Sequence, residues 1–268
     1  MQKLIYGLYR LLFARTVFYK FNKLLYQLSL RGLGILNFES DKLSGEEHFI
    51  EDHVSTIREG VIFDVGANVG NYSKKLRESN ANVEIFCFEP HPVNFQKLQK
   101  NTAQLNMKLF NVGVGSAAGK LKLYDYADYD GSSHASLYKG VIEEIHKGKS
   151  IEHEVNVIAL DEFADQQAIE KVYLLKIDTE GHEFDVLKGF ERLIRAGKVD
   201  LIHIEFNEMN VVSRVFFKDF WDFLPEYNFY RMLPDGLVPI RKYTPVSCEI
   251  FAYQNIVAKL KTGTDSNL

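Results

Sequence analysis

The chain has 268 residues, of which 46% are hydrophobic and 25% charged, with a formal net charge of −4 and a pI near 6.1. This balance predicts a globular protein and argues against a nucleic-acid partner, because nucleic-acid binders usually carry a basic domain or stripe. The two cysteines, Cys87 and Cys248, match neither a disulfide framework nor a zinc-ligand spacing. We therefore expect a reducing, cytoplasmic setting.

The first 36 residues differ from the rest, because six basic residues stand among apolar ones and no acid precedes Glu39. The basic residues are Lys3, Arg10, Arg15, Lys20, Lys23 and Arg31. Apolar residues recur at helical spacing, so we assign residues 1–55 to a helical N-terminal extension. No apolar run is long enough to span a membrane, and no signal-peptide cleavage site follows. The extension either packs on the main domain or a second subunit, or lies on the anionic inner face of a membrane.

From Val61 onward, short β-branched or aromatic runs alternate with longer amphipathic runs, which predicts βαβ units around a parallel sheet. The expected strands of this sheet cover 61–65, 84–88, 108–112, 172–178 and 201–206. The expected helices cover 71–78, 90–105, 182–188 and 216–224. Two late strands, at 229–232 and 249–253, close the sheet. We assign 56–260 to one doubly wound, mostly parallel α/β domain and 261–268 to a flexible tail.

The helical period disappears between Gly113 and Asp161, where short alternating segments appear. Segments 120–124 and 153–157 predict a hairpin insertion. Aromatic and hydroxyl-bearing residues in this insertion either form a lid over a site or cover an edge of the core. These residues are Tyr124, Tyr126, Tyr129 and those at 131–134.

A glycine-rich turn follows the first predicted strand, with Gly66 and Gly70 flanking Asn68. Glycines in such a turn let the backbone approach a ligand closely. The spacing is not the G-x-G-x-x-G of dinucleotide-binding domains, and Asp64 stands at the strand end. A carboxylate there repels a pyrophosphate but suits the sulfonium and amino groups of S-adenosylmethionine. The pattern therefore favours S-adenosylmethionine over NAD.

Glu89 directly follows the second predicted strand, 19 residues beyond Gly70. At this point of a nucleoside-binding α/β fold, an acid accepts hydrogen bonds from ribose hydroxyls. Alone, Glu89 would be explained as an acid stabilised at a helix N-terminus. Paired with the glycine turn at this separation, the ribose interpretation is the better one.

Four ionisable residues, Lys176, Asp178, Glu180 and His182, stand within seven positions at the end of the strand predicted over 172–178. Ligands bind at the carboxyl ends of strands in open α/β sheets, so this density favours a functional role. Lys176 and Asp178 share one face of the strand. They could instead form a partly buried ion pair, and His182 could be a surface residue or a helix cap.

His203 and Glu205 share one face of the next strand, whose end lies near Asp178 in a parallel sheet. Asp178 and Glu205, with His182 as a further candidate, could bind a divalent cation such as Mg²⁺ or Mn²⁺. They could equally form a hydrogen-bonded network with Lys176, which is the alternative we favour.

Together these motifs resemble those of the FkbM-type methyltransferases. The matching segments are 64–70, 88–90, 111–113, 175–183, 186–189 and 204–206. The resemblance covers about residues 60–206 and continues weakly to the end. It implies a class I, Rossmann-like methyltransferase fold, S-adenosylmethionine as donor, and O-methylation of a hydroxyl, often on a sugar or a glycosylated natural product. It gives cofactor roles to Gly66, Asn68, Gly70 and Glu89, and reaction-side roles to residues 176–182.

The expected reaction is in-line attack of an acceptor hydroxyl on the donor methyl carbon, with His182, Glu180, Asp178 or a metal ion removing the proton. A base N-methyltransferase is disfavoured, because Asp-Thr-Glu-Gly follows the fourth strand where such enzymes carry a Pro-Pro-aromatic turn. The N-terminal segment resembles relatives in surface-glycan synthesis, which predicts a glycan-type acceptor. The alternative is a non-catalytic S-adenosylmethionine-binding scaffold that docks on a membrane or partner through its basic N-terminus. Either protein could form a homo-oligomer.

Overall fold

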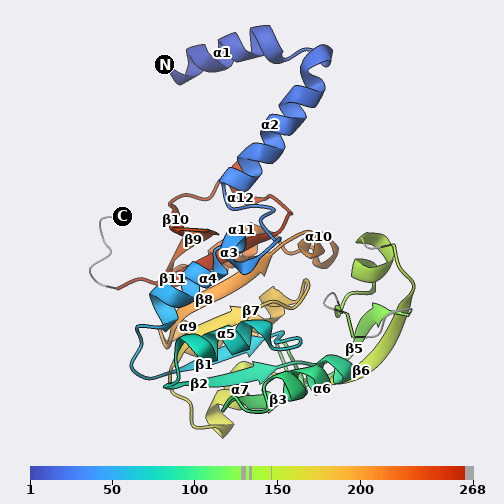
Figure 1. Ribbon diagram of the computed structural model, residues 1–268, viewed down its shortest axis with the longest axis vertical. Helices are drawn as coiled ribbons and strands as arrows, with labels where there is room; N and C mark the ends of the chain where they lie inside the picture. Colours follow the sequence, from blue (N-terminus) through green and yellow to red (C-terminus); the bar gives the residue numbers. More distant parts are fainter. Residues whose placement is uncertain (128–130, 133–134, 146, 263–268) are drawn as a thin grey trace.

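A computed structural model describes residues 1–127, 131–132, 135–145 and 147–262. An eight-stranded sheet forms the centre, a three-stranded sheet stands beside it, and a helical arm extends from the N-terminus (Figure 1). The predicted α/β architecture, with a mostly parallel sheet, is confirmed.

The main sheet has the strand order β10-β9-β11-β8-β7-β1-β2-β3. Its parallel strands are β1 (Gly60–Val65), β2 (Val83–Phe88), β3 (Lys108–Phe110), β7 (Val172–Ile177) and β8 (Val199–Phe206). Antiparallel pairing adds β11 (Gln254–Leu260), β9 (Tyr227–Leu233) and β10 (Gly236–Ile240) at one edge. Most positions of β1, β2, β7 and β8 are buried, because helices cover both faces of the sheet.

The antiparallel edge departs from the sequence prediction. The strand expected over 249–253 is wrong, because the last strand, β11, begins only at Gln254, after the short helix α12 (Pro245–Cys248). Gln254 and Asn255 are buried polar residues that disguise the start of this strand, and Gln254 accepts a hydrogen bond from Arg231. Strand β10 was not expected, and its Pro239 is tolerated because it lies on an edge strand.

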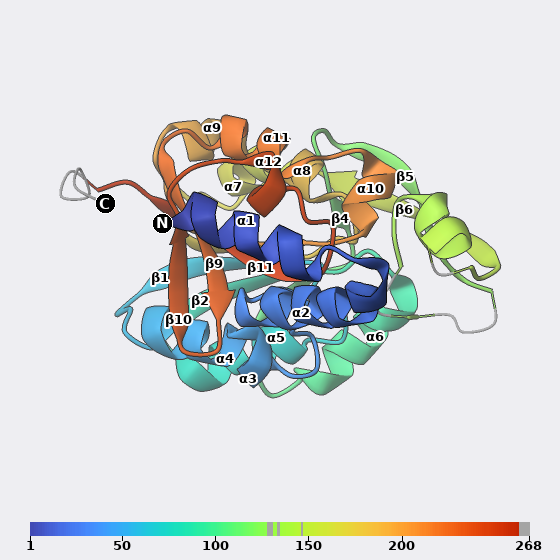
Figure 2. The ribbon, with the colours of Figure 1, turned by 90° about the horizontal axis from the view of Figure 1, so that it is seen from above.

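Two helical layers enclose the main sheet (Figures 1 and 2). One contains α3 (Asp41–Ser44), α4 (Glu46–Phe49), a π-helical turn (Ile50–Val54), α5 (Asn71–Ser79) and α6 (Pro92–Asn101). The other contains α7 (Leu160–Gln166), α8 (Glu183–Lys188), α9 (Glu191–Arg195) and α11 (Phe217–Phe223), while α10 (Met209–Ser213) follows β8. Phe49, Leu76 and Leu98 anchor the first layer, and Phe163 and Phe220 help to anchor the second.

The insertion forms the three-stranded sheet, in the order β4-β6-β5. Its strands are β4 (Gly113–Val114), β5 (Gly119–Tyr126) and β6 (Ser150–Ile158), and a π-helical turn (Val141–Ile145) lies between the last two. β5 and β6 pair antiparallel from Gly119 opposite Val157 to Tyr126 opposite Ser150. The predicted hairpin is therefore confirmed.

The N-terminal arm (residues 1–36) contains α1 (Gln2–Phe13), a 3-10 turn (Thr16–Phe18) and α2 (Tyr19–Gly32), and its helices project away from the domain (Figure 1). α1 has no buried residue, and α2 has only Leu30. Residues 41–54, by contrast, pack on the main sheet. Within the described part of the chain, no helix is long and apolar enough to cross a membrane.

Candidate active site

The carboxyl ends of β1, β2 and β7 lie side by side, and each leads into a loop with predicted site residues. Val65 of β1 pairs with Phe88 of β2 and with Ile177 of β7. Gly66 follows with φ of 83°, and a Cβ at this position would lie 1.7 Å from the carbonyl oxygen of Asp178. Glycine is therefore required for the β1 and β7 loops to meet this closely.

Glu89, at the end of β2, is bound to the glycine turn. Its carboxylate accepts hydrogen bonds from the backbone N–H groups of Asn68 and His91, at 2.8 Å each. Asn68 adopts φ of 49° in this turn. A carboxylate has about four lone-pair positions, so two stay free for ligand hydroxyls. Burial raises the pKa of Glu89 to about 7, although both hydrogen bonds oppose the shift.

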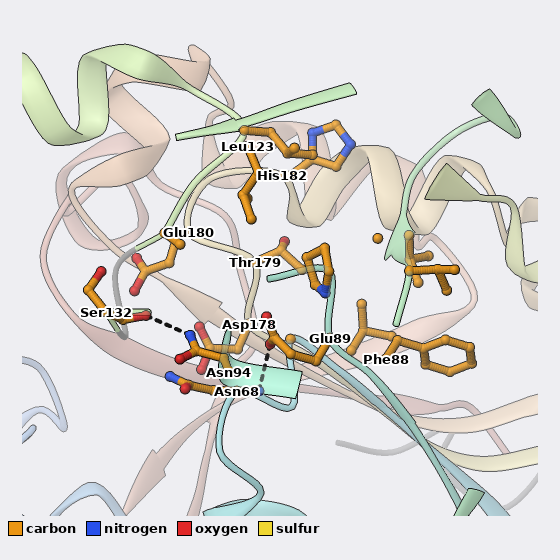
Figure 3. Close-up of a pocket in the computed structure, with 18 residues that line it drawn as sticks. Asn68, Phe88, Glu89, Asn94, Leu123, Ser132, Asp178, Thr179, Glu180 and His182 are labelled. Carbon is orange, nitrogen blue, oxygen red and sulfur yellow. Dashed lines mark hydrogen bonds between the residues drawn. The ribbon is translucent and has the colours of Figure 1, made fainter. Parts of the chain in front are cut away.

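A pocket of about 610 Å³, including its open mouth, lies over these strand ends (Figure 3). We call it the central pocket. The glycine turn, the end of β2, the β3–β4 loop, the insertion and the β7 loop all contribute to its walls. Its lining residues are Val65, Gly66, Asn68, Phe88, Glu89, Pro90, Asn94, Val112, Gly113, Val114, Leu123, Ser132, Ala135, Leu137, Asp178, Thr179, Glu180 and His182. Apolar walls with a few polar groups at this volume are typical of small-molecule sites.

Asp125 of β5 fastens the insertion over the central pocket. This buried carboxylate accepts hydrogen bonds from the backbone N–H groups of Gly131 (2.6 Å) and Ser132 (2.9 Å), and lies 3.2 Å from His91 Nε2. The Ser132 carbonyl in turn accepts a hydrogen bond from Asn94 of α6 (2.8 Å; Figure 3). Burial would raise the pKa of Asp125, but its hydrogen bonds hold it well below the usual range.

The loop after β7 is organised by Glu183, which is buried. Its carboxylate accepts hydrogen bonds from the backbone N–H groups of Thr179 (3.1 Å) and Gly181 (2.9 Å). Glu180, between them, has φ of 52°, a left-handed conformation that costs energy for a residue with a side chain. Its carbonyl accepts a hydrogen bond from Ser136 of the insertion (2.7 Å), so the insertion and this loop hold each other in place.

His182, at the start of α8, lines the central pocket and is nearly buried. Among the described residues, neither ring nitrogen has a hydrogen-bond partner; Nδ1 lies 3.6 Å from Oδ2 of Asp185. Burial lowers the pKa of His182, and Asp185 only partly offsets this. The imidazole is therefore neutral near pH 7 and can accept a proton.

A second cavity, of about 650 Å³ including open solvent, adjoins the central pocket at Gly66, Asn68 and Asp178. We call it the polar cavity. Lys176 lies in it with its Nζ 3.0 Å from Oδ2 of Asp178. Burial lowers the pKa of Lys176, but Asp178 and other nearby carboxylates more than offset this and raise it above its usual value. The ion pair between Lys176 and Asp178, one of the two alternatives above, is what the structure contains.

Comparison with known proteins assigns the family. The family model described as "Methyltransferase FkbM domain" matches residues 64–230, which carry all three strand-end loops. The chain belongs to the FkbM methyltransferase family. It is thus an S-adenosylmethionine-dependent methyltransferase with a class I fold, as the resemblance implied.

Three relatives of this FkbM-family chain illustrate the range of acceptors. The 2-O-methyltransferase NoeI of Sinorhizobium fredii is 23% identical over 66% of this chain and 76% of its own length. The hexuronic acid methyltransferase AglP of Haloferax volcanii is 26% identical over 60% of this chain and 63% of its own. The 31-O-demethyl-FK506 methyltransferase FkbM of Streptomyces tacrolimicus is 27% identical over 52% and 63%. The chain spans less than two thirds of the last two relatives.

The central pocket fits the S-adenosylmethionine of this methyltransferase family at Gly66, Asn68 and Glu89. Gly66 lets the β1 and β7 loops meet at the pocket wall, and Glu89 retains acceptor positions for ribose hydroxyls. Gly70 and Asp64 do not line this pocket. Gly70, with φ of 90°, precedes α5, where a Cβ would meet Leu98 at 2.7 Å.

The predicted carboxylate at Asp64 faces inward in this methyltransferase. Asp64 is buried, accepts a hydrogen bond from Ser73 of α5 and lines the polar cavity, where Lys176 also lies. Burial raises the pKa of Asp64, and Lys176 opposes the shift. A direct contact with the donor therefore requires the donor to reach the polar cavity, which adjoins the central pocket.

The side chains around Asp178 and Glu205 do not support the cation site predicted there. Among the described residues, no group of three or more His, Cys, Asp or Glu side chains could hold a metal. Asp178 is already paired with Lys176. His182 and Glu205 line different cavities.

The sequence prediction missed several residues that shape the site, namely Asp125, Ser136, Tyr138 and Glu183. Only Glu183 carried a local signal, four residues after Thr179, whose N–H and hydroxyl it binds. Ser136 and Tyr138 act through contacts distant in sequence, and Asp125 acts through His91 and through backbone N–H groups six and seven residues ahead. Of the predicted lid, Tyr124 lines one groove together with His182, whereas Tyr129 and residues 133–134 lie outside the described residues.

Proposed function

We propose that this methyltransferase transfers the methyl group of S-adenosylmethionine to a hydroxyl group of a sugar or glycosylated acceptor, with His182 as the proton acceptor. The observation that carries the proposal is the place of His182, which lines both the central pocket and a neighbouring groove. A base at this junction can reach an acceptor hydroxyl that enters from the groove and attacks the methyl group of a donor held in the central pocket.

The neighbouring groove, which we call the acceptor groove, has about 910 Å³ including open solvent. It shares Leu137 and His182 with the central pocket, and the rest of its lining is Lys120, Leu121, Lys122, Tyr124, Tyr138 and Glu154. Tyrosine combines an apolar ring face with a hydroxyl, which suits the mixed surface of a sugar. The ring centroids of Tyr138 and His182 are 6.0 Å apart, so an acceptor against Tyr138 lies next to the base.

For methyl transfer, the protein must align the acceptor oxygen with the donor methyl group and remove the hydroxyl proton. The donor supplies an electrophilic methyl carbon, which the acceptor oxygen must approach in line with the departing sulfur. A sugar hydroxyl is too weakly acidic to ionise at pH 7, so a base must take its proton as the new bond forms. His182 is neutral, its ring nitrogens have no hydrogen-bond partner in the part of the chain that the structure describes, and Asp185 lies close enough to stabilise the imidazolium that results.

The names of two relatives support a sugar-type acceptor. NoeI is a 2-O-methyltransferase and AglP a hexuronic acid methyltransferase. In the acceptor groove, Lys120 and Lys122 supply cations that suit an acidic sugar, although each is now paired with a glutamate across the hairpin. The role in surface-glycan synthesis and the cytoplasmic location remain predictions, and no divalent cation is needed in this proposal.

An acceptor panel tests the proposal. The full chain is mixed with S-adenosylmethionine and neutral sugars, hexuronates or a nucleobase, and S-adenosylhomocysteine release is measured with the mass and position of the added methyl group. We expect methyl ethers on a sugar, and Tyr138→Ala should raise KM for that sugar by about tenfold. Tyr26→Ala, an exposed tyrosine of the arm, is the matched control. Donor binding without methylation of any hydroxyl would favour the scaffold alternative.

A further inference from the structure

The N-terminal arm exposes an apolar surface that its own domain leaves uncovered. In α1, Leu4 is 78% exposed, Leu8 56% and Leu11 63%. None of the residues of α1 is buried, and the arm stands off the domain in the side view (Figure 1). Packing on the main domain, one of the three interpretations of this segment, therefore does not account for these side chains.

Each helix of the arm separates its apolar residues from its cations. In α1, Leu4, Leu8 and Leu11 recur at intervals of four and three residues and form one stripe, while Lys3 and Arg10, seven residues apart, share another. Both helices have exposed apolar side chains along the whole stripe. In α2 the stripe consists of Phe21, Leu24, Leu25 and Leu28, and the cations are Lys20, Lys23 and Arg31.

The charge of the arm differs from that of the rest of the chain. The arm carries six cations and no acid, and because the whole chain has a formal charge of −4, the remainder carries −10. An amphipathic helix of this kind, with basic and apolar faces and no acid, is suited to the interface of an anionic bilayer. There, the apolar face enters the headgroup region and the cations meet lipid phosphates.

We propose that the arm binds the surface of an anionic phospholipid bilayer and anchors the methyltransferase domain there. A twofold dimer formed through the apolar stripes would place two arms with six cations and no acid each close together, which is electrostatically unfavourable. An anionic bilayer complements both the charge and the apolar stripe. This inference does not depend on which acceptor the enzyme methylates.

Cosedimentation of the full chain with vesicles tests the proposal. We expect binding to phosphatidylcholine vesicles that contain phosphatidylglycerol, weakening with added salt, and little binding to phosphatidylcholine alone. Lys3→Gln with Lys20→Gln should lower the partition coefficient about 25-fold, since each cation contributes about fivefold. Leu8→Ser with Leu11→Ser should lower it by about 30-fold or more.

Control variants outside the arm show whether any loss of vesicle binding is specific to the arm. Val246→Ser removes an apolar side chain that is 91% exposed outside the arm, and Arg241→Gln with Lys242→Gln removes two exposed cations there; neither should change partitioning. The Leu8 and Leu11 substitutions fall in a helix without buried residues, so the melting temperature should stay that of the parent. Absence of binding to anionic vesicles overturns the proposal. So does a parent that is dimeric by light scattering and becomes monomeric in the leucine variant without any vesicle binding.

Discussion

The donor side and the acceptor side of this site are built in different ways. On the donor side, the backbone of the glycine turn and the carboxylate of Glu89 form one unit through main-chain hydrogen bonds. On the acceptor side, the side chains of Tyr138 and His182 meet because an insertion folds back over the β7 loop. The donor side therefore depends on Gly66 and Glu89, whereas an acceptor site made of side chains on an insertion can change with the acceptor.

The largest effect is expected for Asp178→Asn, at the boundary of the two sides. Asparagine keeps the size but removes the charge that pairs with Lys176. We expect turnover to fall by about 100-fold or more, with donor affinity within a few-fold of the parent. Single-turnover kinetics and calorimetry measure the two quantities.

Two additions make the Asp178→Asn result decisive. Asp200→Asn, which removes another lysine-paired aspartate away from the site, should leave turnover unchanged. We also expect EDTA to leave the parent's activity unchanged. Loss of activity with EDTA and recovery with Mg²⁺ or Mn²⁺ would instead make Asp178 and Glu205 metal ligands. A folded Asp178→Asn protein with near-normal turnover would place the chemistry elsewhere.

The donor side alone is tested by Glu89→Ala. Loss of two hydrogen bonds to ribose should weaken S-adenosylmethionine binding by about 1 to 3 kcal/mol, while kcat at saturating donor changes less. Because the pKa of Glu89 is raised to about 7, the carboxylate protonates as pH falls, so donor affinity should drop between pH 8 and pH 6 by about fivefold to tenfold. Glu84→Ala, on the exposed face of the same strand, is the control. Unchanged affinity in Glu89→Ala would contradict the ribose contact.

The smallest effect is expected for Asp125→Asn, which loosens the insertion. We expect about 1 to 3 kcal/mol lower stability at pH 7, because several N–H and O–H donors lose a charged acceptor. The folded-state pKa of Asp125 is depressed, so this stabilisation is present above the unfolded pKa of about 3.9 and is lost as pH falls below it. The melting-temperature gap between parent and variant should therefore narrow toward pH 3. Asp222→Asn, at an exposed position of α11, should show no such gap.

The sequence predicts the donor side of the site better than the acceptor side. The glycine turn, Glu89 and the 176–182 stretch each lie within a few residues of a strand end, so alternating hydrophobicity and local motifs were enough to locate them. The inward place of Asp64 was not foreseen, because it depends on Ser73 in the following helix. Asp125 and Tyr138 were not predicted either, since their roles arise only when the insertion closes over α6 and the β7 loop. The start of β11 was missed because buried amides interrupt its apolar pattern.

The pH dependence of kcat at saturating donor and acceptor tests most directly the claim that the two sides meet at His182. Burial lowers the pKa of His182 below its usual value of 6.5, so kcat should be level at neutral pH and fall as pH drops through that lower pKa. His182→Gln should cost roughly 100-fold or more in kcat and lose this acid limb, while His48→Gln, away from both binding spaces, should keep the parent profile. A His182→Gln enzyme with the parent's kcat and the same acid limb would contradict the account.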